Sequence, residues 1–299
     1  MTHGDTDAQV STWQGHDLQA LLKLRAVGEG TWRTTCVEPN SHGRVFGGQM
    51  LAQTVMAAAQ GVDEDRLVTV MQMMFLQGAD TRQAVNFAVT RLQHGKRFTS
   101  FHVRGGQGDR AVCDAHVSFA VPLEALSHEV PIAAVADPTV SLLPEEMPEA
   151  WSSAVEAAVG HVFKSKPALE FRLPDPPRGL RLTLPEPRFR FWVRAKSQLP
   201  DDSHVHAAVL AYMSDHWFNY ASVGGHIDGL RAGEQLYMAS LNHALWVHRR
   251  VRADEWLLFD IQSPCAGSGR GFVVARVHDR AGHLVASGTQ ECVMTPRGG

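Results

Sequence analysis

The segment from Val45 to Val62, VFGGQMLAQTVMAAAQGV, contains no charged residue, although 20% of the whole chain is charged. A helix that is apolar on all sides is a buried helix, and a protein in water can bury it by wrapping a curved antiparallel sheet around it. About 17 helical residues at 1.5 Å rise per residue would form a rod of roughly 25 Å, a suitable length for such a filling. The segment therefore predicts a central helix inside a sheet.

Two glycines, Gly47 and Gly48, stand at the start of this predicted helix. Because they have no side chains, another backbone or a ligand can approach them closely. The free N–H groups of a first helical turn can also bind an anion or a polarised carbonyl oxygen. Simple packing of the glycines against the sheet explains the pair equally well, so the motif alone leaves both interpretations open.

Length and composition indicate a globular protein. With 299 residues, of which 44% are hydrophobic, the chain can form about two domains with sizeable cores. The formal net charge of −3 provides no general attraction to nucleic acid or to an anionic membrane. The four cysteines form no CxxC pair and follow no secretory signal, which favours reduced thiols and a cytoplasmic location. No apolar run approaches the roughly 20 residues of a membrane-spanning helix.

The same order of elements is predicted twice along the chain. In each half a short strand is followed by an apolar helix and then by four β-rich runs. In the first half the strand is at 31–38, the helix at 45–62 and the runs at 68–76, 84–92, 98–104 and 111–121. In the second half the strand is at 189–195, the helix at 203–221 and the runs at 237–248, 255–262, 270–278 and 284–294. Residues 1–17 are polar and are expected to be frayed. Residues 124–185, rich in Pro, Glu and Ala, are expected to form a connector with one helix near Ala150 to Gly160.

A fixed offset supports an internal duplication. Arg97 and Val112 are fifteen residues apart, and so are Arg270 and Val285, in similar local sequences that lie 173 residues apart. The pattern predicts an α+β fold built from two repeats, each an antiparallel curved sheet wrapped around a long central helix.

Asp215 is the candidate for chemistry within the second apolar segment. Its neighbours on a helical wheel are mostly apolar, namely Ala208, Ala211, Tyr212, Phe218 and Asn219. A buried carboxylate without partners is costly, so it needs hydrogen-bond donors from nearby strands, as in many hydrolytic sites. An alternative is that Asp215 only caps the helix or pairs locally.

Other catalytic motifs are absent from the sequence. The stretch CAGSGRG has Ala266 where a G-x-S-x-G elbow needs its first glycine, and no dinucleotide-binding or Walker motif occurs. His204 and His206 form an H-x-H pair, but on a helix their rings point about 200° apart. Together with His243 and His248 they could suggest a metal, but sixteen histidines among 299 residues create such pairs by chance. We therefore expect neither a metal site nor a cofactor.

Several motifs occur along the chain in a fixed order: RVFGGQMLAQTVMAAAQ, YMSDHWF, LNHALWVHR, EWLLF, RGFV and GHLVASGTQECVM. Together they resemble the type II acyl-CoA thioesterase (TesB-like) family over about residues 17–296, most loosely over 124–185. The resemblance implies a double hotdog fold, with repeats at 1–123 and 186–299, a connector at 124–185, and the catalytic trio in the second repeat. It implies hydrolysis of fatty acyl-CoA to free CoA and fatty acid by direct attack of an activated water.

Matching the motifs assigns the trio. The Asp of the SD element is Asp215, the Gln of the VASxxQE element is Gln290, and the hydroxyl residue three positions before the His of NHALW is Ser240, where threonine is common. Asn242 stands where the family often has Asp. A serine holds its rotamer less firmly than a β-branched threonine, so these departures bear on rate and substrate preference.

The chemistry of these residue types agrees with the resemblance. Asp215 can accept a proton from water while Ser240 and Gln290 fix the water's position. Backbone N–H groups near Gly48 and Gln49, at the start of the first helix, are candidate donors to the thioester oxyanion.

The phosphates of CoA require cationic side chains at the rim of the site. Lys96, Arg97 and Arg270 are the candidates, although charges near turns are commonly only solvated.

The duplication also predicts how many sites one chain has. With the offset of 173, Gln290 corresponds to Val117, whose side chain can neither donate nor accept a hydrogen bond, so we expect one active site per chain. Ser240 and His243 are expected on opposite faces of one strand, because side chains alternate along a strand. Ser240 is therefore expected to position water and not to attack as a nucleophile.

Two other functions remain as alternatives. Hotdog hydratases, which add water to enoyl-CoA, use a D-x-N-P-x-H pattern, but Tyr220 stands five residues after Asp215. A non-catalytic acyl-CoA-binding protein would be favoured if the trio were replaced by apolar residues. Acyl-CoA is the expected partner, with no nucleic acid and no membrane span. Because hotdog sheets commonly pair at their edges, a homodimer or larger homo-oligomer is expected.

Overall fold

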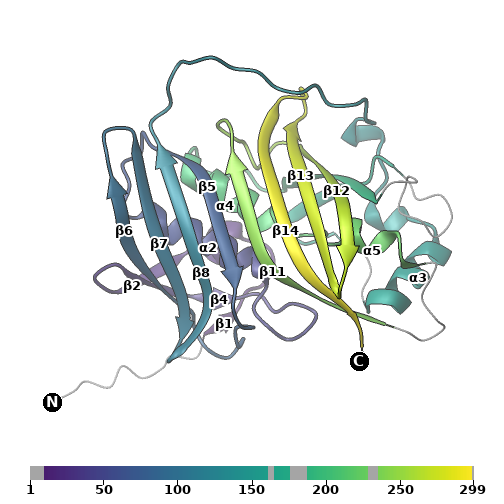
Figure 1. Cartoon of the computed structure of the whole chain (residues 1–299), viewed down its shortest axis with the longest axis horizontal. Coiled ribbons are helices and arrows are strands. Elements are labelled where there is room, and N and C mark those ends of the chain that lie inside the picture. Colours follow the sequence, from purple (N-terminus) through teal and green to yellow (C-terminus); the bar gives the residue numbers. More distant parts are fainter. Residues whose placement is uncertain (1–9, 161–164, 176–186, 228–234, 298–299) are drawn as a thin grey trace.

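The computed structural model describes residues 10–160, 165–175, 187–227 and 235–297 (Figure 1). Its α-helices are α1 (Leu18–Leu22), α2 (Gly47–Ala59), α3 (Glu149–Val159), α4 (Ser203–Ser214) and α5 (Tyr220–Gly224). Its strands are β1 (Ser11–Thr12), β2 (Leu24–Gly28), β3 (Thr31–Thr34), β4 (Cys36–Val37), β5 (Leu67–Phe75), β6 (Asn86–His94), β7 (Phe98–Gln107), β8 (Arg110–Ala120), β9 (Leu169–Arg172), β10 (Arg188–Ala195), β11 (Leu236–Val247), β12 (Leu257–Gly267), β13 (Arg270–Asp279) and β14 (Leu284–Pro296).

One curved sheet runs through both halves of the chain. Its 12 described strands follow the order β2-β3-β6-β7-β8-β5-β11-β14-β13-β12-β10-β9, and β5 joins β11 in antiparallel pairing at the middle (Figure 1). The order outward from this junction is the same on both sides, since β8, β7 and β6 follow β5 as β14, β13 and β12 follow β11. This arrangement agrees with an internal repeat, and the predicted α+β double hotdog fold is confirmed.

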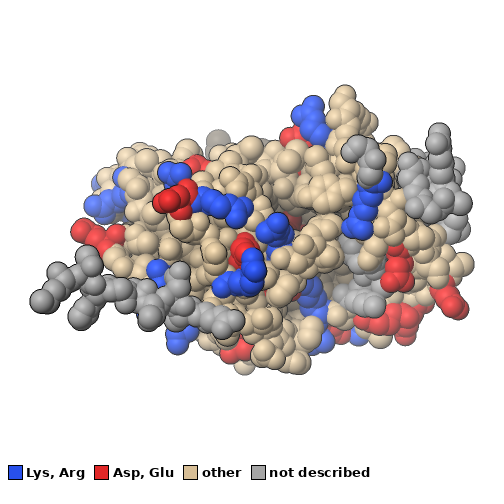
Figure 2. All heavy atoms as spheres, turned by 90° about the horizontal axis from the view of Figure 1, so that it is seen from below, with Lys and Arg blue, Asp and Glu red and all other residues tan. Residues whose placement is uncertain are grey.

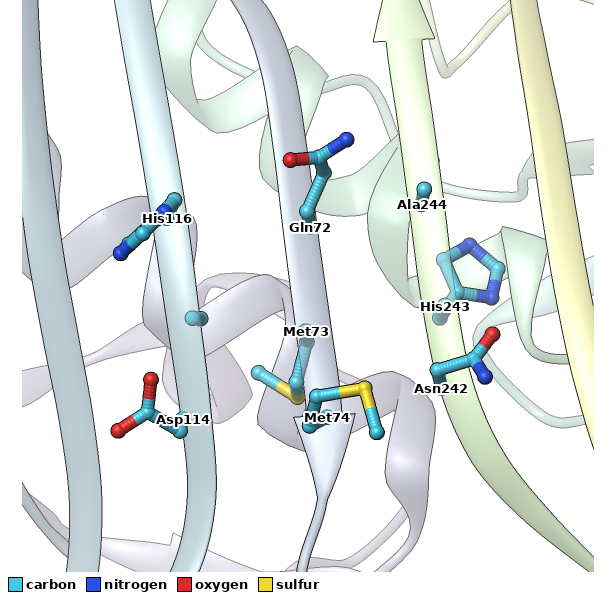
Figure 3. Close-up of a pocket in the computed structure, with 9 residues that line it drawn as sticks. Gln72, Met73, Met74, Asp114, His116, Asn242, His243 and Ala244 are labelled. Atoms are coloured by element: carbon cyan, nitrogen blue, oxygen red, sulfur yellow. The ribbon is translucent and has the colours of Figure 1, made fainter.

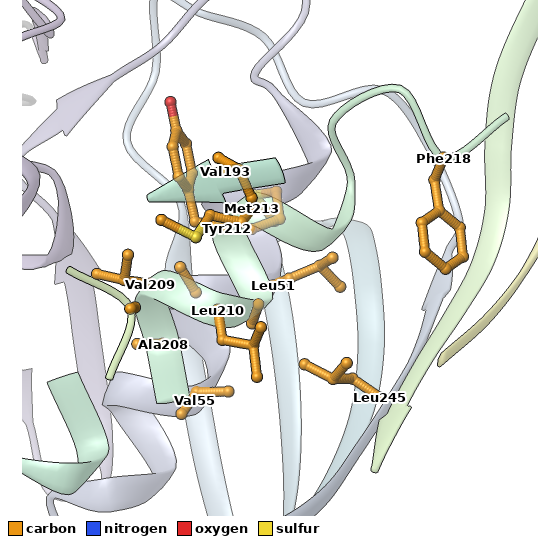
Figure 4. Packing of buried hydrophobic residues seen from close by; sticks show 14 of the residues in the cluster. Leu51, Val55, Val193, Ala208, Val209, Leu210, Tyr212, Met213, Phe218 and Leu245 are labelled. Carbon is orange, nitrogen blue, oxygen red and sulfur yellow. The ribbon is translucent and has the colours of Figure 1, made fainter. Parts of the chain in front are cut away.

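The charge-free segment forms α2, the buried helix that its composition predicts. From Gly48 to Ala59 every residue except Met56 is buried, and α2 packs against α4 within the main core. Figure 4 shows Leu51 and Val55 of α2 in one cluster with Leu210 of α4. The helix has 13 residues, fewer than expected, because Phe46 is extended. No helix among the described residues is long and apolar enough to cross a membrane.

Gly47 and Gly48 allow the start of α2 to lie against the end of α4. A Cβ atom on Gly48 would come within 2.6 Å of the carbonyl oxygen of Tyr212, and one on Gly47 within 2.4 Å of Oδ2 of Asp215. Any larger side chain would therefore push the two helices apart. The sheet is close to Gly47 as well, since a Cβ there would lie 3.3 Å from the ring of Phe75 on β5.

The second apolar segment is not one continuous helix. α4 ends at Ser214, Asp215 is its C-terminal cap, and Trp217 has a φ of 56° before α5 begins. A positive φ is unfavourable for an aromatic residue, but the Trp217 ring packs on Phe171 with centroids 4.2 Å apart. Tertiary packing thus breaks the helix at the carboxylate.

The N-terminal segment and the connector contain structure that the sequence did not indicate. In the part of residues 1–17 that the structure describes, β1 pairs with β4 and Trp13 is buried, so the expectation of a frayed segment is wrong from residue 10 onward.

In the connector, the helix expected near Ala150 is confirmed as α3. Within 124–185, β9 also pairs with β10 at the edge of the sheet. The domain limits at 123 and 185 stay a prediction.

Truncating α2 at its centre should destabilise the whole fold. Leu51 is fully buried, and Leu51→Ala is expected to lower the free energy of unfolding by about 2–5 kcal/mol, because it leaves a cavity between α2 and its neighbours. Leu92→Ala, which removes the same atoms from a side chain that is 57% exposed, is expected to change it by less than about 0.5 kcal/mol. Urea unfolding followed by circular dichroism measures both, and equal losses would contradict a core centred on α2.

Candidate active site

The structure brings together the three residues that the sequence assigned to the site. Ser240 Oγ donates a hydrogen bond to Oδ1 of Asp215 at 3.1 Å, and Gln290 Nε2 donates to Ser240 Oγ at 2.9 Å. Asp215 lies at the end of α4, Ser240 on β11 and Gln290 on β14. The carboxylate thus obtains its donors from neighbouring strands, as its burial requires.

A bulge in β11 decides where Ser240 points. The register with β14 shifts between Ser240 and Asn242, which interrupts the alternation of side chains. Ser240 and His243 consequently both face the interior, so the expectation of opposite faces is wrong. Gln290 lies between them, because its Oε1 accepts a hydrogen bond from His243 Nδ1 while its Nε2 donates to Ser240.

Asn219 is a fourth member of the cluster. Its Oδ1 accepts a hydrogen bond from Gln290 Nε2 at 3.0 Å, and its Nδ2 lies 3.4 Å from Ser240 Oγ. The sequence placed Asn219 beside Asp215 on a helical wheel without assigning it a role. Its amide among the mostly apolar neighbours of Asp215 was the feature of the sequence that could have indicated a role.

Burial controls the electrostatics of Asp215. Loss of water contact raises the pKa of its carboxyl group to about 6, while hydrogen bonds from Ser240, Gln290 and the backbone of Gly48, with the charge of Lys166, act in the opposite direction. The N-terminus of α2 also faces this carboxylate, and its partial positive charge favours the anion. Asp215 is therefore ionised at neutral pH but can be protonated only slightly below it.

A lysine from the connector reaches the site. Lys166 forms an ion pair with Glu38, whose Oε2 accepts a hydrogen bond from the Tyr212 hydroxyl at 2.7 Å. The ammonium group also lies over the ring of Phe46, 4.7 Å from its centroid. The ion pair between Lys166 and Glu38 joins residues 128 positions apart, which is why no local sequence pattern indicated Lys166.

A pocket of about 610 Å³ opens beside the cluster. Its wall includes Asp215 and Ser240, and most of its other lining residues come from 39–50, 75–79, 165–167, 216–220 and the start of β11. Much of this wall is apolar, including Met50, Phe75 and Trp217. Gln290 is fully buried behind Ser240 and does not line the pocket.

The cationic residues at the pocket differ from those that the sequence suggested for CoA. Lys96 and Arg97 directly precede Phe98 at the start of β7, and Phe98 pairs with Ala120 at the end of β8. Phe75, which lines the pocket, pairs with Cys113 near the opposite end of β8. The β6–β7 turn therefore lies at the end of the sheet far from this pocket, and a role of Lys96 and Arg97 in CoA binding stays a prediction.

Arg270 is also engaged elsewhere. It forms an ion pair with Glu291 at 2.9 Å and does not line the pocket. The pocket wall instead contains Arg44, His42 and Lys166. Figure 2 views the molecule from below and shows Lys and Arg atoms spread among uncharged ones on that face.

The two residues proposed as oxyanion donors have other contacts. The Gln49 side chain is fully buried, accepts a hydrogen bond from the Glu38 N–H at 2.7 Å and donates to the Cys36 carbonyl at 2.7 Å. The Gly48 backbone bonds to Asp215. Gly47 lines the pocket, whereas Gly48 and Gln49 do not. Their role at an oxyanion stays a prediction.

A second, smaller pocket of about 350 Å³ lies where β8, β5 and β11 run side by side (Figure 3). Asp114 and His116 on β8, Met74 on β5 and Asn242 on β11 contribute to it. It contains neither Asp215 nor Ser240. No group of His, Cys, Asp or Glu in the described part of the chain is arranged to hold a metal ion.

Fold and site define a double hotdog protein with a buried carboxylate, a hydroxyl and an amide beside a mainly apolar pocket. Family models described as the acyl-CoA thioesterase N-terminal and C-terminal domains match residues 37–120 and 141–294. These matches cover more than half of the chain, so the chain belongs to the type II acyl-CoA thioesterase family, as its motifs suggested.

Individual relatives agree with this assignment. The chain is 29% identical to acyl-coenzyme A thioesterase 8 of Mus musculus, over 92% of this chain and 88% of that protein. It is 27% identical to acyl-CoA thioesterase 2 of Haemophilus influenzae, over 92% and 96%. The crystal structure of the acyl-CoA thioesterase II TesB2 from Mycobacterium marinum is similar with a TM-score of 0.75, at 27% identity and over 94% and 99% of the two chains.

The raised pKa of Asp215 predicts that the difference in stability between the wild type and Asp215→Asn depends on pH. Because the folded pKa of about 6 exceeds the ordinary value of 3.8, the fold loses stability as pH rises between these values and Asp215 ionises. Asp215→Asn carries no charge at any pH, so it should equal the wild type near pH 4 and exceed it at pH 8 by about 1–3 kcal/mol. Denaturant unfolding of both proteins between pH 4 and pH 8 measures the difference in their free energies of unfolding. A difference that stays constant over this range would refute the raised pKa of Asp215.

Proposed function

We propose that this chain hydrolyses acyl-CoA thioesters to free CoA and carboxylic acid by direct attack of water that Asp215 activates. The observation that carries the proposal is the Asp215–Ser240–Gln290 cluster at the wall of a pocket that is mostly apolar. An apolar pocket suits an acyl chain, and a carboxylate with a pKa of about 6 is a suitable general base near neutral pH.

The reaction needs one proton to move twice. Asp215 takes a proton from water as the water oxygen attacks the thioester carbonyl carbon. The tetrahedral intermediate then collapses, the C–S bond breaks, and the sulfur of CoA leaves as a thiol with the proton returned by Asp215. Water, thioester, thiol and carboxylic acid balance without another reactant.

Ser240 acts in this scheme as a positioning hydroxyl. Its hydrogen atom is directed at Asp215 and its oxygen accepts from Gln290. No histidine is among its described hydrogen-bond partners, so the pair of serine and histidine on which serine nucleophiles commonly depend is not formed. N–H groups at the start of α2 are the proposed donors to the oxyanion, and Gly47, the first residue of that turn, lines the pocket.

Hydration of an enoyl-CoA is the less favoured alternative. The histidine next to Asp215 in the sequence is His216, whose Nδ1 lies 3.0 Å from the Tyr212 carbonyl oxygen and therefore donates to it. Burial lowers the pKa of His216 well below its usual value, so the ring is neutral at physiological pH. It occupies no position of the D-x-N-P-x-H pattern that hydratases use.

Removing the base should abolish most of the activity. Asp215→Asn is expected to lower kcat by at least about 10²-fold and to leave KM within several-fold, because the amide keeps the shape of the carboxylate but cannot accept the proton. The wild-type kcat/KM should fall as pH decreases below about 6, where Asp215 becomes protonated. Release of free thiol from a series of acyl-CoAs measures both.

The same samples test for a covalent intermediate. Intact mass spectrometry of quenched reactions should show no acyl group on Ser240. A near-normal turnover by Asp215→Asn, or a burst of CoA with an acyl adduct, would refute the proposed mechanism.

CoA binding is proposed at Arg44, with His42 and Lys166 nearby in the pocket wall. Arg44→Ala should raise KM for acyl-CoA about 3- to 10-fold, because a guanidinium group binds phosphate through charge-assisted hydrogen bonds. KM for the matching acyl-pantetheine, which has no nucleotide phosphates, should not change. Arg97→Ala is the matched control, since Arg97 is equally exposed but lies at the far end of the sheet. An equal effect of both variants would place the CoA phosphates elsewhere.

A homodimer or larger homo-oligomer and a cytoplasmic location also remain proposals. The sheet ends in β2 on one side and β9 on the other among the described strands, and such edges are where hotdog sheets pair.

A further inference from the structure

A chain of hydrogen bonds extends from the site into the core. Gln290 Oε1 faces His243 Nδ1, and His243 Nε2 lies 2.9 Å from Ser214 Oγ. Ser214 and His243 are almost inaccessible to solvent, as is Gln290. Since Ser214 directly precedes Asp215 in the sequence, the chain begins and ends at adjacent residues of the α4 terminus.

The charge of Asp215 determines the direction of every bond in this chain. The Ser240 hydroxyl gives its single hydrogen to the Asp215 carboxylate, so the Ser240 oxygen can only accept from its next neighbour. The end of the Gln290 amide that faces Ser240 must then be the NH₂ group. The other end is the carbonyl oxygen, which requires a hydrogen on Nδ1 of His243.

The remaining bond completes the series. A neutral His243 with its hydrogen on Nδ1 presents a lone pair on Nε2, and the Ser214 hydroxyl can donate to it. If His243 were protonated, Nε2 would donate to Ser214 Oγ, whose hydrogen would turn to the Ala211 carbonyl oxygen 2.8 Å away. Nδ1 carries a hydrogen in both cases, so the orientation of Gln290 does not depend on whether His243 is protonated.

From this geometry we infer that His243 is a positioning residue for the reaction, holding the Gln290 amide in the single orientation that directs the Ser240 hydroxyl at Asp215. Without the Nδ1 hydrogen, the Gln290 amide is held only by the contacts of its Nε2 with Ser240 and Asn219, and it can rotate by 180° and present oxygen to Ser240 if the Asn219 amide turns as well. The Ser240 hydroxyl would then turn from Asp215 to Gln290, and the base would lose its donor. This inference rests on the proposed function for its catalytic consequence, but not for the arrangement itself.

The arrangement also selects the oxygen of Asp215 that carries the proton during turnover. Oδ1 is held by the Ser240 hydroxyl, whereas Oδ2 lies against Gly47, which lines the pocket. Oδ2 is therefore the oxygen that takes the proton from water and returns it to the leaving sulfur.

The tautomer of His243 can be measured without any substrate. In protein labelled with ¹⁵N-histidine, the ring nitrogens of His243 are identified by their loss from the spectrum of His243→Asn. At neutral pH we expect hydrogen on Nδ1 and a lone pair on Nε2. Hydrogen on Nε2 with a lone pair on Nδ1 would overturn the inference.

Kinetics test whether His243 acts through Gln290. His243→Leu should lower kcat about 10-fold or more with KM within about 3-fold, since it removes the donor and leaves the pocket wall intact. His243→Asn, whose amide can donate near the former Nδ1 position, should recover most of the loss. In a His243→Leu and Gln290→Ala double variant, kcat should be no lower than in Gln290→Ala alone.

A control variant separates this effect from the loss of a buried histidine in general. His278 on β13 is equally buried, and its ring has no hydrogen-bond partner among the described residues. His278→Leu should leave kcat unchanged. Additive losses in the double variant, or no recovery in His243→Asn, would refute the inference. A wild-type protein with the Nδ1 tautomer but no thiol release would instead refute the proposed thioesterase function.

Discussion

The contact between the first turn of α2 and the last turn of α4 is the constraint on which the rest of the structure depends. Only glycines allow it, because a Cβ atom at Gly48 would strike the Tyr212 carbonyl and one at Gly47 the Asp215 carboxylate. The contact brings the positive end of one helix to the charged group that ends the other. The two helices fill one sheet, so the closeness of their ends decides where the pocket lies and which residues surround the carboxylate.

The site combines a costly burial with a complete set of donors. Asp215 loses water contact, which raises its pKa, but Ser240, Gln290 and the Gly48 backbone each supply a hydrogen bond. A carboxylate balanced in this way is charged at neutral pH and still basic enough to accept a proton. The directional bonds continue beyond Gln290 to His243 and Ser214, so residues away from the pocket take part in fixing the position of the reacting group.

The two halves of the chain have the same order of elements but different tasks. β11 and β14 provide Ser240 and Gln290, whereas Val117 on β8, which the sequence offset equates with Gln290, is buried and apolar. The first half contributes the start of α2, Glu38 and much of the pocket wall. Lys166 of the connector joins both, through Glu38 on one side and the charge that it exerts on Asp215 on the other.

The sequence by itself determined the buried helix, the duplicated order of elements and the family, because charge-free composition, strand periodicity and short motifs are local properties. It also identified Asp215, Ser240 and Gln290 through those motifs. Only the tertiary structure decided the remaining features: the bulge that turns Ser240 inward, the break of the helix at Trp217, the contacts of Lys166, and the distance of Lys96 and Arg97 from the pocket. These features depend on pairing and packing between segments far apart in the chain, which leave no pattern in the residues themselves.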